Sequence, residues 1–119
     1  MMGFKTGLAE KRKEKLEREL ERIILELKKL NVEKIILFGS LTTGNIHKAS
    51  DIDIIVVQET EKRFLERIEE LYEYLKPKVA IDILVYTPDE FEEMKNWNPF
   101  IKSVLTKGRI IHEKPKRDS

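Results

Sequence analysis

The residues most able to do chemistry in this sequence are two aspartates that open an apolar run. Asp51 and Asp53 are separated by one isoleucine and are followed by the apolar residues 54–57. Because side chains alternate along a β-strand, both carboxylates are predicted to lie on one face of that strand. Two neighbouring carboxylates at the end of a buried strand repel each other, so we expect a cation or strong hydrogen-bond donors beside them.

A third carboxylate interrupts another apolar run. Asp82 is the only charged residue in residues 79–86, VAIDILVY, which predict a strand covered on both faces. If this strand lies beside the strand of Asp53, three carboxylates converge at one end of the sheet. Oxygen ligands without cysteine or clustered histidine select Mg²⁺ or Mn²⁺ over zinc. In the alternative interpretation, Asp51 caps a turn, Asp53 tops a strand, and Asp82 pairs with a lysine or arginine.

A glycine–serine pair ends the apolar run that precedes the first two aspartates. Gly39 lacks a Cβ atom, so the backbone there can turn sharply or let a ligand approach closely. Residues 40–43 are expected to begin a short helix, whose free N–H groups would favour an anion beside Ser40. The spacing of Gly39 and Gly44 invites comparison with a P-loop, but Asn45 stands where that motif needs lysine, so we reject it.

Together, Gly39-Ser40, Gly44 and Ser50-Asp51-Ile52-Asp53 resemble the signature of the DNA polymerase β-type nucleotidyltransferase superfamily. The small chain is most similar to its minimal nucleotidyltransferase (MNT) group, over roughly residues 32–111. The resemblance implies an α/β (α+β) domain in which a small mixed sheet of about three to four strands is flanked by helices, as in the polymerase β palm. It also implies Mg²⁺-dependent transfer of a nucleoside monophosphate, most readily AMP from ATP, to a hydroxyl acceptor.

The resemblance assigns metal ligation to the three carboxylates. Asp51 and Asp53 would bridge two Mg²⁺ ions, with Mn²⁺ as an alternative metal. Asp82 would hold only the ion that activates the acceptor hydroxyl, and could accept its proton.

It also assigns the phosphates of the nucleotide to the glycine–serine turn. Gly39 and Ser40 would cradle the β- and γ-phosphates through backbone N–H groups and the serine hydroxyl. Gly44 is the second glycine of the signature. Ser50 would hydrogen-bond a phosphate or orient Asp51.

The resemblance further implies a protein partner. In the MNT group the usual companion is a small helical HEPN-type protein, and the pair can act as antitoxin and toxin, with the transferase adenylylating a tyrosine of the toxin. A second copy of the chain is a further option. Many relatives carry arginines in the loop where this chain has Leu41, Thr42 and Thr43. Their absence supports an alternative function, a catalytically degenerate module that binds and neutralises a partner protein by contact.

Hydrophobic spacing predicts the elements that would position these residues. Apolar residues three and four apart predict a first helix that Asn31 ends. Thr60 and Thr87 are predicted N-caps of later helices. The expected helices cover residues 8–30, 61–75, 88–94 and a segment from 97 to Gly108, and the expected strands cover residues 33–38, 51–57, 79–86 and 109–112, the last at the sheet edge.

Length and charge limit the class of protein. A chain of 119 residues predicts one domain with one core, at residues 8–112, between a flexible start (1–7) and a disordered tail (113–119). The near balance of 23 basic and 22 acidic residues argues against direct nucleic-acid binding. Without cysteine there is no disulfide or thiolate nucleophile. The sequence contains neither an apolar run of about 20 residues nor a signal-peptide core, so we expect a cytoplasmic protein.

Overall fold

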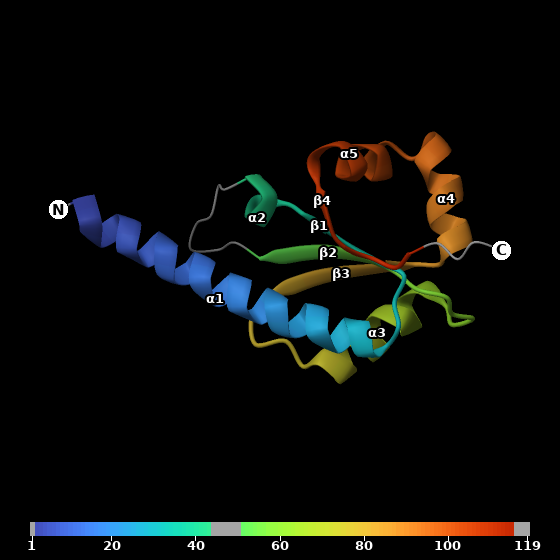
Figure 1. The fold of residues 1–119 in the computed structure, drawn as a ribbon, viewed down its shortest axis with the longest axis horizontal. Coiled ribbons are helices and arrows are strands. Elements are labelled where there is room, and N and C mark those ends of the chain that lie inside the picture. Colours follow the sequence, from blue (N-terminus) through green and yellow to red (C-terminus); the bar gives the residue numbers. More distant parts are fainter. Residues whose placement is uncertain (1, 44–50, 116–119) are drawn as a thin grey trace.

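The computed structural model describes residues 2–43 and 51–115, which form a four-stranded sheet with helices on both faces (Figure 1). The mixed sheet flanked by helices that the sequence predicts is thereby confirmed. In chain order the elements are α1 (Met2–Lys29), β1 (Lys34–Phe38), α2 (Ser40–Thr43), β2 (Ile52–Val57), α3 (Phe64–Leu75), β3 (Ile81–Tyr86), α4 (Pro88–Trp97), α5 (Pro99–Lys107) and β4 (Arg109–Glu113).

The order of the strands in the sheet is β3-β2-β1-β4. Strand β1 is antiparallel to both β2 and β4, whereas β2 and β3 are parallel and joined by α3. Strand β4 lies at one edge, as predicted, and extends one residue further than expected, to Glu113. Both β2 and β3 therefore begin at the same end of the sheet, and the residues that open them become neighbours.

The two faces of the sheet bury separate apolar clusters. On one face, α1 and α3 pack on the alternate residues Ile52, Ile54 and Val56 of β2. On the other face, α4 and α5 pack on Ile55 and Val57. Side-chain alternation therefore places Asp53 on the face of α4 and α5.

Helix α1 lies across one face and its N-terminal part projects beyond the sheet (Figure 1). Leu16, Leu20, Ile23 and Leu27 form its buried stripe at the predicted spacing. The helix begins at Met2, six residues before the expected start, since no proline interrupts these residues. It ends at Lys29, and Asn31 terminates it as predicted, in the turn that follows, with the left-handed φ of 62°.

A buried ion pair fastens α1 to the C-terminal end of α3. Glu19 is only 6% exposed, and both of its carboxylate oxygens accept hydrogen bonds from Arg22, at 2.8 and 3.0 Å. Arg22 Nη2 also donates to the carbonyl oxygen of Leu75, at 2.9 Å, and the backbone N–H of Lys78 donates to Glu19. Where the chain leaves α3, Glu19 thus accepts from the N–H of Lys78, and Arg22 donates to the carbonyl oxygen of Leu75.

Strand β3 is the second edge of the sheet, which corrects the prediction that it is covered on both faces. Ile81, Ile83 and Val85 are buried, but Asp82 is exposed and Leu84 is half-buried. An edge strand has no neighbour on one side, so side chains of one face remain partly open to solvent. Its apolar sequence, which only Asp82 interrupts, reflects packing on one face and partial cover on the other.

The caps of the later helices agree only in part with the sequence prediction. Thr87 caps α4 as expected, and the side chain of Glu90 completes the capping box. Asn98 caps α5 by accepting from the N–H of Ile101. Helix α3, in contrast, begins at Phe64 rather than after Thr60, because Thr60 accepts instead from the N–H of Lys62 in a turn.

No helix in the described part of the chain is long and apolar enough to cross a membrane.

Candidate active site

Two of the three predicted aspartates face each other across the parallel strands. Asp53 of β2 and Asp82 of β3 are direct partners in the register, so their side chains leave the same face of the sheet. Asp51 is half-buried and lies immediately before β2. On its other side, Asp53 is the register partner of Phe38, the last residue of β1. The sequence predicted that the carboxylates converge if their strands are neighbours. The structure shows this for Asp53 and Asp82.

The surroundings of Asp53 disfavour its charged form. Burial raises the pKa of its carboxyl to about 6, and the negative charge of Asp82, a hydrogen bond with Asp82 and the charge of Asp51 act in the same direction. Neighbouring carboxylates repel each other unless a positive charge compensates them. In the absence of a cation, the raised pKa therefore favours the protonated form of Asp53 at mildly acidic pH.

Gly39 provides the space that Asp53 occupies. The residue has a φ of +78°, and a Cβ atom added there would lie 2.2 Å from Oδ2 of Asp53. Its carbonyl oxygen accepts hydrogen bonds from the backbone N–H of Thr42, at 3.1 Å, and from the Thr42 hydroxyl, at 2.7 Å, at the start of α2. Gly39 is thus required twice, for its left-handed backbone and for the close approach of the Asp53 carboxylate.

The remaining residues of the predicted phosphate site are only partly described. Ser40 is the first residue of α2, as predicted. Gly44 and Ser50 lie outside the residues that the structure describes. Leu41 packs against the cluster under α1 and α3. This leucine therefore helps to anchor α2 to the domain.

The oxygen donors of the site fit a hard divalent cation. Within residues 2–43 and 51–115 there is no ready-made cluster of three metal-ligating side chains. The donor set nevertheless has the chemistry of a Mg²⁺ or Mn²⁺ site, because Asp53 and Asp82 are adjacent oxygen ligands whose mutual repulsion a cation would relieve. Asp51 adds a third negative charge that acts on Asp53.

Sequence reasoning missed the position of one tyrosine beside the site. Tyr72 of α3 is half-buried, and its hydroxyl donates to the carbonyl oxygen of Ile81, one residue before Asp82. Burial raises the pKa of Tyr72, and the negative charge of Asp82 raises it further. A tyrosine in an apolar helical stripe carries no local signal of this contact, since it depends on the packing of α3 over β3.

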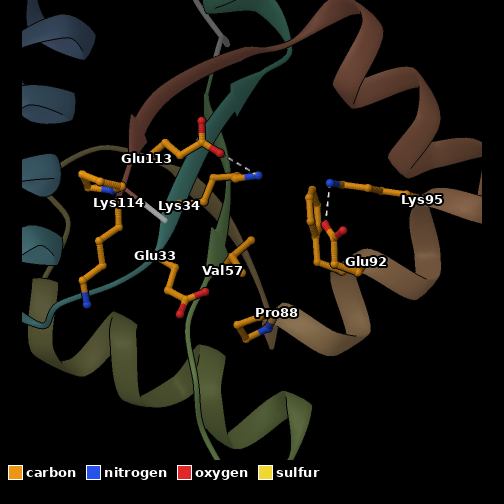
Figure 2. A pocket seen from close by; sticks show the side chains of 10 residues that line it. Glu33, Lys34, Val57, Pro88, Glu92, Lys95, Glu113 and Lys114 are labelled. Carbon is orange, nitrogen blue, oxygen red and sulfur yellow. Dashed lines mark ion pairs between the residues drawn. The ribbon is translucent and has the colours of Figure 1, made fainter. Parts of the chain in front are cut away.

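A cavity of about 740 Å³ lies at the other end of the sheet, between the sheet and α4 (Figure 2). It is lined by Lys34, which pairs with Glu113 at 3.2 Å, and by Lys95, which pairs with Glu92 at 2.5 Å. Lys34 is the partner of Val57 in the register, whereas Asp53 lies at the opposite end of β2. Carboxylates already balance the ammonium groups of Lys34 and Lys95.

Comparison with known proteins places these features in context. The family described as "Nucleotidyltransferase domain" matches residues 17–112. A candidate protein adenylyltransferase of Methanocaldococcus jannaschii is 34% identical over 82 residues, which are 68% of this chain and 79% of that protein.

Two solved structures share the fold. A candidate nucleotidyltransferase of Sulfolobus solfataricus has a TM-score of 0.64 at 19% identity and covers 89% of this chain and 87% of its own. A chain from the crystal structure of a toxin–antitoxin with AMP-PNP has a TM-score of 0.53 at 23% identity and covers 79% of this chain and 73% of its own.

Proposed function

Because this chain belongs to the nucleotidyltransferase domain family, we propose that it transfers the AMP group of ATP to a hydroxyl group of a protein partner. The single observation that carries the proposal is the Asp53–Asp82 pair at the start of two parallel strands, with Gly39 beside it. The relative in M. jannaschii, named a candidate protein adenylyltransferase, supports AMP as the group transferred and a protein as its acceptor.

The proposed reaction follows from the positions of the chain's own residues. The acceptor hydroxyl oxygen attacks the α-phosphorus of ATP, the bond to the β-phosphate oxygen breaks, and pyrophosphate leaves. Asp82, which is exposed, accepts the proton of the hydroxyl. Gly39, free of a side chain, lets the phosphates approach the start of α2, where backbone N–H groups bind them.

Asp51, Asp53 and Asp82 would hold the Mg²⁺ or Mn²⁺ ions of the reaction. Bound divalent ions lower the pKa of the acceptor hydroxyl and neutralise charge on the departing pyrophosphate. The raised pKa of Asp53 means that this residue must lose its proton before it can bind a cation.

We further propose that the partner is a small helical HEPN-type protein, with this chain as the antitoxin of a toxin–antitoxin pair. The structural similarity to a chain of a toxin–antitoxin that was crystallised with AMP-PNP supports this assignment. The acceptor in the partner would be a tyrosine hydroxyl.

A second candidate function is neutralisation of the partner by contact alone. It is favoured by Leu41, Thr42 and Thr43, which leave α2 without the arginines that would help to hold phosphate. A charge-assisted hydrogen bond to phosphate contributes about 1.5–3 kcal/mol, so the missing arginines would weaken nucleotide binding without abolishing it.

Calorimetric titration with ATP, with and without Mg²⁺, tests the proposed function. We expect Mg²⁺-dependent binding in the wild type, and its loss in Asp53→Asn and Asp82→Asn. Asp89→Asn changes an exposed residue in the first turn of α4. It is the matched control and should bind as the wild type does. Mass spectrometry of a co-expressed partner should then show an added AMP with the wild type only. Neutralisation that persists in Asp53→Asn, with an unmodified partner, would favour the contact function.

A further inference from the structure

Two phenylalanines form an aromatic wall next to Asp53. Phe38 is the cross-strand partner of Asp53 and lies on the same face of the sheet. Phe100, the second residue of α5, meets it edge to face, with ring centroids 5.6 Å apart and the ring planes at 84°. The wall therefore begins beside the carboxylate and continues onto the helix that covers this face.

The packing of α5 does not account for Phe100. Ile101 and Val104 anchor the helix in the cluster beneath it, with exposures of 0% and 4%, whereas Phe100 stays 42% exposed. In an edge-to-face pair, the ring that presents its edge keeps both of its faces free of the other ring. With 42% of Phe100 exposed, part of this ring stays open to solvent.

The order of the strands separates the two sides of the site. Asp82, on the side of β3, is the residue to which the acceptor hydroxyl is assigned, whereas Phe38 and Phe100 lie on the side of β1. The phosphates are assigned to α2, which directly follows Phe38 in the chain. If the phosphates bind at α2, the base can lie on the side of β1, away from the acceptor.

We propose that Phe38 and Phe100 form the stacking wall for the purine base of the donor nucleotide. This inference rests on the proposed function and names the residues that recognise the base end of its substrate. Stacking on an aromatic ring is tolerant of base identity, because every base has a π-face. The wall therefore adds affinity for nucleotides over inorganic phosphates and discriminates only weakly among purines.

The test compares Mg²⁺-ATP with Mg²⁺-tripolyphosphate, which has the phosphates but no base. Phe100→Ala removes the ring, and Phe100→Leu keeps apolar volume without an aromatic face. We expect both variants to bind Mg²⁺-ATP roughly tenfold more weakly than the wild type and to bind Mg²⁺-tripolyphosphate unchanged. Phe64→Ala, which removes a partly exposed phenylalanine from α3, is the matched control and should change neither affinity.

Intrinsic fluorescence offers a second readout. Trp97, the single tryptophan, is 61% exposed and lies three residues before Phe100 in the sequence. Its emission should change when the wild type binds ATP and not when it binds tripolyphosphate. The melting temperature of each variant verifies that the domain is folded.

Each alternative result has a distinct meaning. If Phe100→Ala and Phe100→Leu bind ATP as the wild type does, or lose affinity for both ligands equally, the stacking wall is wrong. Wild-type protein that binds ATP no better than tripolyphosphate also overturns it, and leaves the proposed function in place. Loss of partner binding in Phe100→Ala with unchanged ATP affinity would instead identify the wall as a protein-docking surface. If the wild type binds neither ligand, both the proposed function and the inference are rejected.

Discussion

Residue 39 shows how one missing side chain determines the geometry of the site. At Gly39, a Cβ atom would collide with the Asp53 carboxylate, and the φ of +78° is unfavourable for any residue with a side chain. The glycine is therefore not merely a flexible joint. It is the space into which the carboxylate of the neighbouring strand projects.

We expect Gly39→Ala to destabilise the protein by about 1–3 kcal/mol, because the backbone is strained and Asp53 is displaced. Transfer activity and Mg²⁺-ATP binding should fall further than this loss of stability explains. Gly108→Ala is the matched control, since a Cβ atom there would also be too close to a neighbouring group. It would lie 2.5 Å from the backbone carbonyl oxygen of Val104. Urea unfolding and calorimetry should show destabilisation in both variants but a loss of ATP affinity, at temperatures where both are folded, only in Gly39→Ala.

Asp53 has a measurable cost for stability in the absence of metal. Its pKa is raised from 3.8 to about 6, so the folded protein binds this proton more tightly than the unfolded chain does. The free energy of unfolding must therefore fall as the pH rises through the interval between these two values. Asp53 therefore lowers the stability of the metal-free protein at neutral pH, which fits the role proposed for it in binding a cation.

We expect Asp53→Asn to stabilise the metal-free protein at about pH 7.5 by on the order of 1 kcal/mol, since it removes the like-charge repulsion. The gain should shrink at about pH 4, where the wild-type carboxyl is protonated. Thermal unfolding with a chelator present measures both values. Glu73→Gln, on the exposed face of α3, controls for the removal of one charge. An equal melting temperature for wild type and Asp53→Asn at both pH values would contradict the raised pKa.

At the scale of elements, side chains of α3 protect the outer edge of β3. The Tyr72 hydroxyl donates to the carbonyl oxygen of Ile81, and Arg67 Nη1 donates to that of Val85, at 3.2 Å. Arg67 also pairs with Glu90 at 2.7 Å, which joins α3 to the capping box of α4. An edge strand with free carbonyl groups is a template for another strand, so these contacts limit unwanted pairing.

We expect Arg67→Ala to expose this edge and to promote self-association that increases with protein concentration. Arg67 is only 10% exposed. The variant should also lose stability, because it lacks the hydrogen bond to Val85 and the ion pair with Glu90. Size-exclusion chromatography with light scattering, over a range of concentrations, measures the association. Arg63→Ala, four residues earlier on an exposed position, should remain as the wild type. Association of both variants to the same extent would show that loss of charge, and not the open edge, is the cause.

At the scale of the whole molecule, the Glu19–Arg22 pair joins segments that are far apart in the sequence. It fixes α1 against the end of α3 and the segment that leads into β3, the strand that carries Asp82. Hydrogen bonds from Arg22 hold the pKa of Glu19 below its ordinary value of 4.5, against the opposing effect of burial. A lowered carboxyl pKa contributes stability above 4.5, which is lost as the pH falls through the folded-state value.

We expect Glu19→Gln to lower the free energy of unfolding at neutral pH by about 1.5–3 kcal/mol, the contribution of hydrogen bonds to a charged group. The difference between wild type and variant should diminish on acidification below 4.5, where the wild-type carboxyl becomes protonated. Urea unfolding at several pH values measures this convergence. The exposed Glu17→Gln should match the wild type throughout. A constant difference at all pH values would mean that Glu19 acts by packing and not by its charge.

The sequence by itself determined the features that depend on neighbouring residues. Apolar spacing located the longer helices and the strands with bounds that differ by three residues or fewer, except that α1 begins six residues before its expected start. Local cap chemistry identified Asn31 and Thr87 correctly. It misplaced the start of α3, because Thr60 had two local hydrogen-bonding options and made a turn. The pairing of two aspartates behind a glycine–serine turn was likewise sufficient to indicate the family, since this signature is short and contiguous.

Only the tertiary structure decided which distant residues meet. Asp82 lies beside Asp53 because β2 and β3 are parallel and in register, which no spacing along the chain specifies. The same holds for Phe100 against Phe38, Tyr72 against Ile81, and Glu19 against the N–H of Lys78. These contacts depend on strand order and on how the helices pack over each face. Both follow from the burial of the whole apolar surface at once, and not from the preferences of any one segment.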